Sequence, residues 1–351
     1  MKSKQFFYIS AVMAAINLTA CGGGGDGGGG GQALPVNGMG AMPGQVQNPV
    51  VVKTPETQLI QTVSSSSYPA GSEDLAAFNK LNAERSQCGF GKLTQSTQID
   101  AAARAHNDYQ IINNTDSHFE NKTQFPTGFT GVTGLDRVIA AGYTDAQAVK
   151  DDYVYKTSLS KVGVGEGGIR SLLSAPYHMS GLLGSSRDVG LSVRSNTEST
   201  PQGVSPVVFV HVNTAIKGTA GPQLIEPNDV ATYPCAGSIT INRQLTDEIP
   251  NPVPGRDLRA SPIGSAVYIS LREGNVLNIA SATMVETVSN TAVVLRSPIT
   301  KANDPNALYK VHEGYVAPDA PLKALTQYSV DIRGTNNGIA FTRQFSFTTG
   351  A

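Results

Sequence analysis

Apolar residues recur at helical spacing in the first half of the chain and at strand-like spacing further on. Five stretches in which apolar residues return every third or fourth position predict helices, starting near Ser72, Gln95, Leu135, Thr144 and Pro176. The helix from Thr144 is expected to run to about Tyr155. Apolar runs at 189–193 and 207–212 then predict strands. Helices followed by strands within one unit indicate an α+β fold.

The last third of the chain has a different pattern. Short apolar runs at 266–271, 292–295, 328–332 and 340–347 alternate with turn residues such as Gly, Asn, Asp and Pro. Many short strands across residues 256–351 predict an antiparallel β-sandwich. The prolines between 250 and 254 predict a stiff, extended joint before this part, since proline fixes its own backbone and restricts the residue before it.

The N-terminal residues have the parts of an export signal. A positive start precedes an apolar stretch from Phe6 to Leu18, which is too short to span a bilayer as a permanent helix. The stretch ends in Leu18-Thr19-Ala20-Cys21, which resembles the sequence that bacterial lipoprotein-processing enzymes recognise. The resemblance implies a signal peptide over residues 1–21 and a lipid on Cys21, and the alternative is a plain secretory signal. Gly22 resembles the sorting signal for the outer membrane of two-membrane bacteria, so we expect a lipid-anchored protein of the cell envelope.

Residues 22–70 are rich in Gly, Pro, Ser and Gln, and we expect a flexible linker that holds the folded part away from the membrane. The net charge of -1 gives no support for nucleic-acid binding. No second long apolar stretch follows, so the lipid is the only membrane contact that the sequence predicts.

With Cys21 assigned to the lipid, Cys88 and Cys235 remain as an even pair. In an oxidising compartment they are expected to form a disulfide, which would stabilise the fold by about 4 to 5 kcal/mol in the chain-entropy model. Two buried free thiols are the alternative. Metal ligation has less support, because neither cysteine has a Cys or His partner at the spacing of a zinc finger.

The sequence lacks the common catalytic motifs: there is no His-Glu-x-x-His, no Gly-x-Ser-x-Gly and no phosphate-binding loop. What remains is an ordered set of short motifs between residues 72 and 215. They are Asn82-Ala-Glu-Arg85, the helix with His106, Ser117-His118, Leu135-Asp136-Arg137, Gly165-Glu166 and Ser174-x-x-x-His178. Their succession resembles the CAP superfamily of cysteine-rich secretory proteins, antigen 5 and pathogenesis-related proteins.

The resemblance implies an α-β-α sandwich over residues 71–245 with a shallow cleft that binds a divalent metal in some members. It places His118, Glu166 and His178 in that cleft. This sequence departs from the family because Gly167 replaces an Asn and the second family glutamate has no counterpart.

Asp116 and Glu120 are candidates for that missing carboxylate. Two imidazoles and one carboxylate suit Zn²⁺ with an open position, and they also suit a hydrogen-bonded cluster without metal, which the missing glutamate favours. His106, on a helix stripe, and His211, within an apolar strand, are interpreted as structural.

Residues 256–351 resemble the bacterial Ig-like modules of surface proteins through Pro321-x₆-Tyr328-x-Val330 and Phe345-x-Phe-x-Thr349. The leading hypothesis is a non-catalytic lipoprotein whose CAP-like cleft binds a lipid, a peptide or a partner protein. One alternative is a metal-dependent hydrolase of cell-envelope material, with Glu166 as general base and the two histidines as ligands. The other alternative is an adhesin.

Overall fold

The structure is a computed structural model that describes residues 58–157, 162–200 and 203–351. Cys21 and most of the predicted linker lie outside the described residues. The end of that linker does not: Val63 and Tyr68 pack against the hydrophobic core, and the Lys92 N–H donates to the carbonyl of Ile60 at 2.7 Å. Residues 58–70 therefore belong to the folded unit.

A four-stranded sheet with the order β1-β3-β4-β2 is the centre of the first part of the fold. β1 (Thr94–Gln95) pairs in parallel with β3 (Asp188–Thr200). β4 (Gly203–Lys217) pairs antiparallel with both β3 and β2 (Ala146–Thr157). Because β2 has a neighbour on one side alone among the described residues, it is an edge strand of the sheet.

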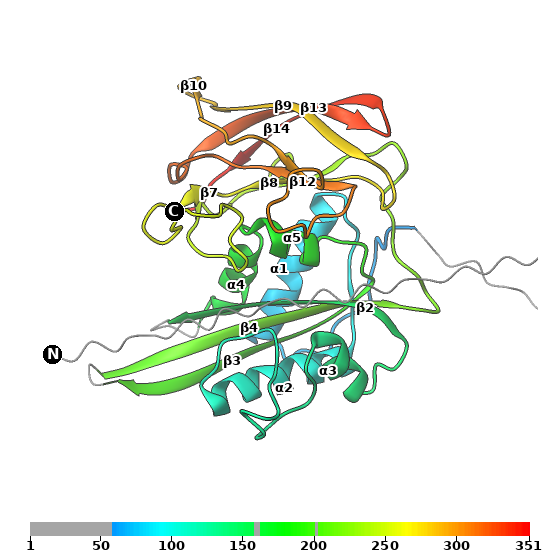
Figure 1. Cartoon of the computed structure of the whole chain (residues 1–351), viewed down its shortest axis with the longest axis vertical. Coiled ribbons are helices and arrows are strands. Elements are labelled where there is room, and N and C mark those ends of the chain that lie inside the picture. Colours follow the sequence, from blue (N-terminus) through cyan, green and yellow to red (C-terminus); the bar gives the residue numbers. More distant parts are fainter. Residues whose placement is uncertain (1–57, 158–161, 201–202) are drawn as a thin grey trace, which may run out of the picture. The chain divides into compact units, whose positions relative to one another are not determined.

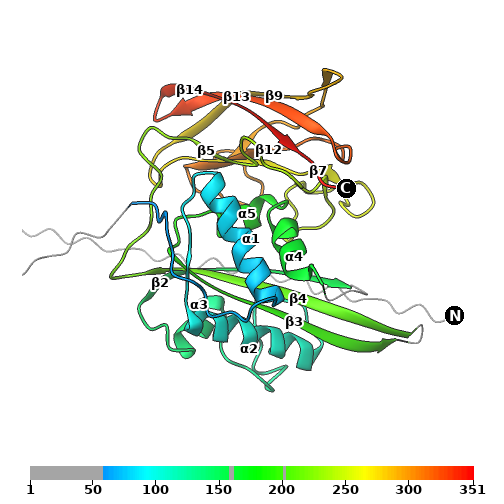
Figure 2. The same ribbon diagram turned by 180° about the vertical axis from the view of Figure 1, so that it is seen from behind.

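Helices cover both faces of this sheet. One face carries α2 (Thr97–Asn113) and α3 (Gly134–Ala140), and the other carries α1 (Glu73–Gln87), α4 (Val164–Leu172) and α5 (Pro176–Leu182) (Figures 1 and 2). Polar side chains set where three of these helices begin, by accepting hydrogen bonds from first-turn N–H groups; they are Ser72, Ser96 and Thr133. The mixed α+β class predicted from the sequence is confirmed.

The prediction of a helix from Thr144 to Tyr155 is wrong, because this stretch forms β2. Tyr153 and Val154 favour a strand, and the stretch pairs with β4 along its length. Pairing in the sheet outweighs the weak helical spacing. As a consequence, the neighbouring residues Asp151 and Asp152 point to opposite faces of the sheet.

The second part of the chain forms two four-stranded sheets in which every pairing is antiparallel. The inner sheet has the order β11 (Ile299–Thr300), β12 (Glu313–Val316), β8 (Val267–Ser270) and β5 (Ala231–Tyr233). The outer sheet has the order β10 (Thr291–Ala292), β9 (Leu277–Glu286), β13 (Gln327–Asn336) and β14 (Ile339–Thr348). A short ribbon pairs β6 (Gln244–Leu245) with β7 (Ile263–Gly264).

The inner sheet lies between the outer sheet and helices α1 and α5 (Figures 1 and 2). Every residue of β8 and β12 is therefore buried, polar ones included. The buried carboxylate of Glu313 accepts hydrogen bonds from Ser180 of α5 at 2.8 Å and from Tyr268 of β8 at 2.9 Å. Residues from both parts of the chain thus form one continuous core. β5 lies before the predicted joint in the sequence, yet it pairs with β8, which lies after the joint.

A disulfide links Cys88, at the end of α1, to Cys235, just after β5. The predicted pairing of the two cysteines is confirmed. The bridge closes a loop over a sequence separation of 147 residues and joins the helical layer to the inner sheet.

The double variant Cys88→Ala/Cys235→Ala should unfold with a free energy about 4 to 5 kcal/mol below that of the parent chain, because the unfolded chain gains the entropy of an open loop. Urea titration followed by circular dichroism measures this difference. The parent chain under reducing conditions is the matched control and should show the same loss. A difference under about 1 kcal/mol would show that the bridge does not restrict the unfolded chain as assumed.

Candidate functional site

A cleft with a volume of ≈ 380 Å³ lies along the edge strand β2. Residues of β2 form its floor, and they are Val149, Asp151 and Asp152. One wall comes from α3 and the loop before it, with His118, Phe119, Thr133, Gly134 and Leu135. The other wall comes from α5 and two loops of the second part, with Tyr177, His178, Ile249, Pro250 and Leu308. Because Asp151 and Asp152 face opposite sides of the sheet and still line one cleft, the cleft lies over the edge of β2.

Asp151 is the centre of a buried network on the α3 side. Its Oδ1 accepts hydrogen bonds from Arg137 Nη2 at 2.8 Å and from His211 Nε2 at 2.7 Å. Its Oδ2 pairs with His118 Nδ1 at 3.1 Å. Burial alone would raise the pKa of Asp151, but His211, His118 and Arg137 together hold it well below its usual range. Burial lowers the pKa of His211 to about 4, so this ring is neutral and directs its one N–H at Asp151.

Glycine at position 134 allows α3 to come this close to β2. A Cβ on Gly134 would lie 2.9 Å from the Cβ of Asp151, which is inside van der Waals contact. A larger residue would therefore push α3, with Arg137, away from the Asp151 carboxylate.

Glu120, a candidate for the missing family carboxylate, lies behind the cleft wall and is fully buried. It pairs with His106 Nδ1 at 2.9 Å and accepts the Thr130 N–H at 2.6 Å, while His106 Nε2 pairs with the carbonyl of Ser117 at 3.0 Å. Burial would raise the pKa of Glu120, but these hydrogen bonds lower it overall. His106 and Glu120 thus position the loop that carries His118 and do not line the cleft.

His178 stands on the opposite wall, with its ring centroid 6.3 Å from that of His118. Glu248, in the segment between β6 and β7, pairs with His178 Nδ1 at 3.1 Å and accepts the Tyr177 N–H at 2.8 Å. Burial would lower the pKa of His178, but Glu248 and then Asp152 raise it overall. Both histidines thus line the cleft with Nδ1 held by a carboxylate.

Asp152 differs from the other carboxylates at the cleft. It is buried against α5, where a Cβ on Gly181 would lie 2.3 Å from its Oδ2. Within the described part of the chain, that Oδ2 has no hydrogen-bond partner. Burial raises the pKa of Asp152 to about 6. A buried, unsatisfied acceptor of this kind costs free energy unless a ligand or a water molecule donates to it.

The structure brings two of the three predicted cleft residues together, His118 and His178. It does not bring Glu166 to them: Glu166 lies in the first turn of α4, pairs with Arg170 at 3.3 Å and is absent from the cleft lining. Asp116, the other candidate carboxylate, accepts a hydrogen bond from Tyr153 at 2.6 Å. The carboxylates that do serve the cleft are Asp151, Asp152 and Glu248.

The predicted alternative of a Zn²⁺ site can be compared with the side chains at the cleft. Each histidine has its Nδ1 on a carboxylate, which leaves one ring nitrogen on each, and a catalytic zinc site needs a third protein ligand in reach of both. Among the described residues, no group of three or more His, Cys, Asp or Glu side chains is arranged to hold a metal ion. The residues present therefore do not fit a resident zinc.

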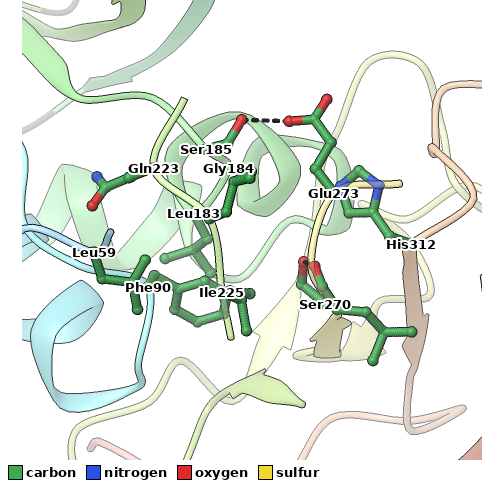
Figure 3. A pocket seen from close by; sticks show the side chains of 12 residues that line it. Leu59, Phe90, Leu183, Gly184, Ser185, Gln223, Ile225, Ser270, Glu273 and His312 are labelled. Atoms are coloured by element: carbon green, nitrogen blue, oxygen red, sulfur yellow. Dashed lines mark hydrogen bonds between the residues drawn. The ribbon is translucent and has the colours of Figure 1, made fainter. Parts of the chain in front are cut away.

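A second cavity lies between the two parts of the fold and has a volume of ≈ 20 Å³ (Figure 3). Ser185 donates to Glu273 at 2.8 Å at its edge, and Phe90 and Ile225 form part of its lining. This space holds about one water molecule. It is too small for an organic ligand, so the cleft over β2 is the candidate site.

No family model matches the chain, and no curated protein matches it. Among solved structures, the chain is similar to an outer surface protein from Borrelia burgdorferi, with 12% sequence identity and a TM-score of 0.32. The match covers 43% of this chain and 96% of the other. Similarity of this degree carries no argument about fold or function. In the part of the chain that the structure describes, no helix combines the length and the apolar character needed to cross a membrane.

The stability difference between Asp152→Asn and the parent chain should depend on pH. In the folded parent chain the pKa of Asp152 is raised from 3.8 to about 6, so the folded state holds this proton more tightly than the unfolded state does. The resulting stabilisation is complete below pH 3.8 and is lost as the pH rises through about 6. The variant cannot bind this proton, so its stability should rise by about 2 kcal/mol relative to that of the parent between pH 4 and pH 7. Urea unfolding of both chains at each pH measures the change. A constant difference would contradict the raised pKa.

Glu248→Gln should lower the pKa of His178, because burial would then act against the charged ring without the opposing carboxylate. Titration of the imidazole resonances by NMR gives this value directly. Glu166→Gln, which changes an exposed carboxylate on α4, is the matched control and should leave the titration of His178 unchanged.

Proposed function

We propose that this chain is an exported lipoprotein of the cell envelope, anchored through Cys21, whose cleft over β2 binds a ligand without catalysis. The proposal includes a CAP-like domain at residues 71–245 and an Ig-like domain at 256–351. Helices on both faces of the first sheet and antiparallel pairing in the later sheets support these two resemblances. The Cys88–Cys235 disulfide supports an oxidising compartment, which fits the export signal.

One observation carries the binding function: large apolar side chains stand exposed around the rim of the cleft. Phe119 is 62% exposed, Ile249 78% and Leu308 50%, and Leu135 lies beside them. Exposed apolar residues gathered around a concave site mark binding surfaces more often than scattered ones do. A volume of ≈ 380 Å³ also lies within the range of small-ligand pockets, about 300 to 1,000 Å³.

The polar groups of the cleft hold one another in place. Asp151 is neutralised by three donors, and the Nδ1 atoms of His118 and His178 are held by carboxylates. These contacts fix the walls of the cleft. The hydrolase alternative needs Glu166 as general base beside the histidines, whereas Glu166 pairs with Arg170 on α4.

Placing charges on the rim should weaken binding of an amphipathic probe. We expect Leu135→Asp/Ile249→Asp to bind anilinonaphthalene sulfonate at least about tenfold more weakly, because an apolar contact is replaced by a solvated charge, and tenfold corresponds to about 1.4 kcal/mol. Fluorescence titration of the full chain carrying Cys21→Ser, which needs no detergent, measures the affinity.

Val288→Asp is the matched control for this experiment. Val288 is 92% exposed in the turn after β9 and does not line the cleft, so this variant should bind the probe like the parent chain. Equal affinity in the parent and the rim variant would refute the cleft as the binding site.

A further inference from the structure

The outer sheet has one long open edge, which is the strand β14. This strand pairs with β13 along its whole length without a bulge, and among the described residues no second strand lies beside it (Figure 2). The other edge strands have two or three residues, apart from β2, which the cleft walls flank. Natural proteins guard long edges with prolines, bulges, charges or a covering segment, because unpaired N–H and C=O groups pair readily with another strand.

Hydrogen bonds at one end of β14 show which of its residues face outward. The Gly237 N–H donates to the carbonyl of Ser346 at 2.9 Å, and the Thr348 N–H donates to the carbonyl of Ser238 at 2.8 Å. Ser346 and Thr348 therefore turn their backbone groups away from β13. Outward and inward groups alternate along an antiparallel strand, so the remaining outward residues are Ala340, Thr342 and Gln344. Within the described chain, no segment forms backbone hydrogen bonds with these three on the open side.

The side chains of the open stretch 339–345 are accessible. Phe341 and Phe345 are half-buried and pack against the core from the inner side of the sheet. Ile339 lies on the same side by alternation and is 68% exposed. Arg343 is exposed as well, and it has no hydrogen bond or ion pair with another described residue. This edge therefore leaves both an apolar side chain and a cation without a partner.

We propose that the stretch 339–345 docks onto the same stretch of a second copy of this chain, in antiparallel pairing about a two-fold axis. The covered residue Ser346 limits the pairing at one end, and the turn before Ile339 limits it at the other. The middle residue is Thr342, whose backbone groups face outward, so the axis passes between the two copies of Thr342. The outward residues of the two copies then share about six main-chain hydrogen bonds.

The side chains of the stretch are complementary to themselves in this register. Ile339 lies opposite Phe345 of the second copy, which covers apolar surface that is exposed in the single chain. Arg343 lies opposite Phe341 of the second copy, where a guanidinium and an aromatic ring attract each other. Thr342 lies opposite itself, and pairs of threonines are favourable across antiparallel strands. Arg343 is the one charged residue in the stretch and does not meet its own copy.

A second copy also accounts for an edge that carries no guard. A two-fold pairing uses the same surface on both chains and closes on itself, so the dimer has no open stretch left at 339–345 and does not grow further. A strand of another protein would have to supply its own match to Ile339 and Arg343, whereas this stretch already supplies both. The surface belongs to the outer sheet, so the inference is independent of the cleft over β2.

Single cysteines in the full chain carrying Cys21→Ser test the register. Opposite residues in a hydrogen-bonded pair have Cα atoms about 5.5 Å apart, which a disulfide can bridge. Thr342→Cys should therefore give a disulfide-linked dimer on mild oxidation, measured by mass without reductant.

Ala340→Cys is the matched control, because residue 340 lies opposite Gln344 of the second copy. The two copies of residue 340 are then roughly 14 Å apart, too far for a disulfide. This variant alone should form no linked dimer, and a mixture of Ala340→Cys with Gln344→Cys should form one.

Sedimentation equilibrium measures the association without a cross-link. The Cys21→Ser chain should pass from monomer to dimer between micromolar and millimolar concentration and form no larger species. Thr342→Pro in this chain should raise the Kd of the dimer at least about tenfold, because proline removes the N–H that faces the second copy and takes no hydrogen bond from β13. Thr342→Val keeps that N–H and should dimerise like the Cys21→Ser chain. Circular dichroism checks that each variant is folded, and if Thr342→Pro is not, the cysteine variants decide.

Three results would overturn the inference. The first is a chain that stays monomeric up to millimolar concentration, and the second is a Thr342→Cys chain that cross-links no faster than Ala340→Cys. The third is a monomer in which the amides of residues 340, 342 and 344 exchange slowly with deuterium, since another segment would then cover the edge.

Discussion

The cleft depends on one buried charge, the carboxylate of Asp151. Arg137 from α3, His211 from β4 and His118 from the cleft wall all direct N–H groups at it, so it joins the helix, the sheet and the loop. Arg137 is fully buried, and removing Asp151 would leave it with the more distant carboxylate of Glu120, 4.0 Å away, so the buried cation would be less well compensated. The wall that carries His118 is therefore held by electrostatics, while the rim above it is apolar.

The order of the sequence motifs predicts the two histidines of the cleft but not its carboxylates. His118 and His178 were predicted and do face each other, since both follow recognisable motifs. Asp151 and Asp152 were missed because residues 144–155 were interpreted as a helix. The β-forming residues Tyr153 and Val154 were the signal that favoured a strand. The family resemblance placed Glu166 in the cleft through Gly165-Glu166, whereas in the structure these residues begin α4 and the half-exposed Glu166 pairs with Arg170.

The α+β class and the strand-rich last third followed from apolar spacing, whereas the close packing of the two parts did not. Periodicity indicates which face of a strand is buried, but β8 and β12 are buried on both faces. Their short sequences therefore do not indicate which element packs on the second face. The proline-rich joint is likewise packed, with Val253 buried, and Ile249 and Pro250 complete the cleft. Long-range contacts of this kind are set by tertiary structure and leave no local pattern.

The narrow spacing of the two histidines has a consequence for association of the folded chain with other copies. An exposed edge strand invites another sheet to join it, which is a common route to aggregation. Here His118 and His178 stand on either side of β2 with ring centroids 6.3 Å apart, and α3 and α5 flank the strand behind them. A whole sheet, with its own covering layers, is too thick to enter between them. The two histidines thus keep the sheets of folded neighbours off this edge.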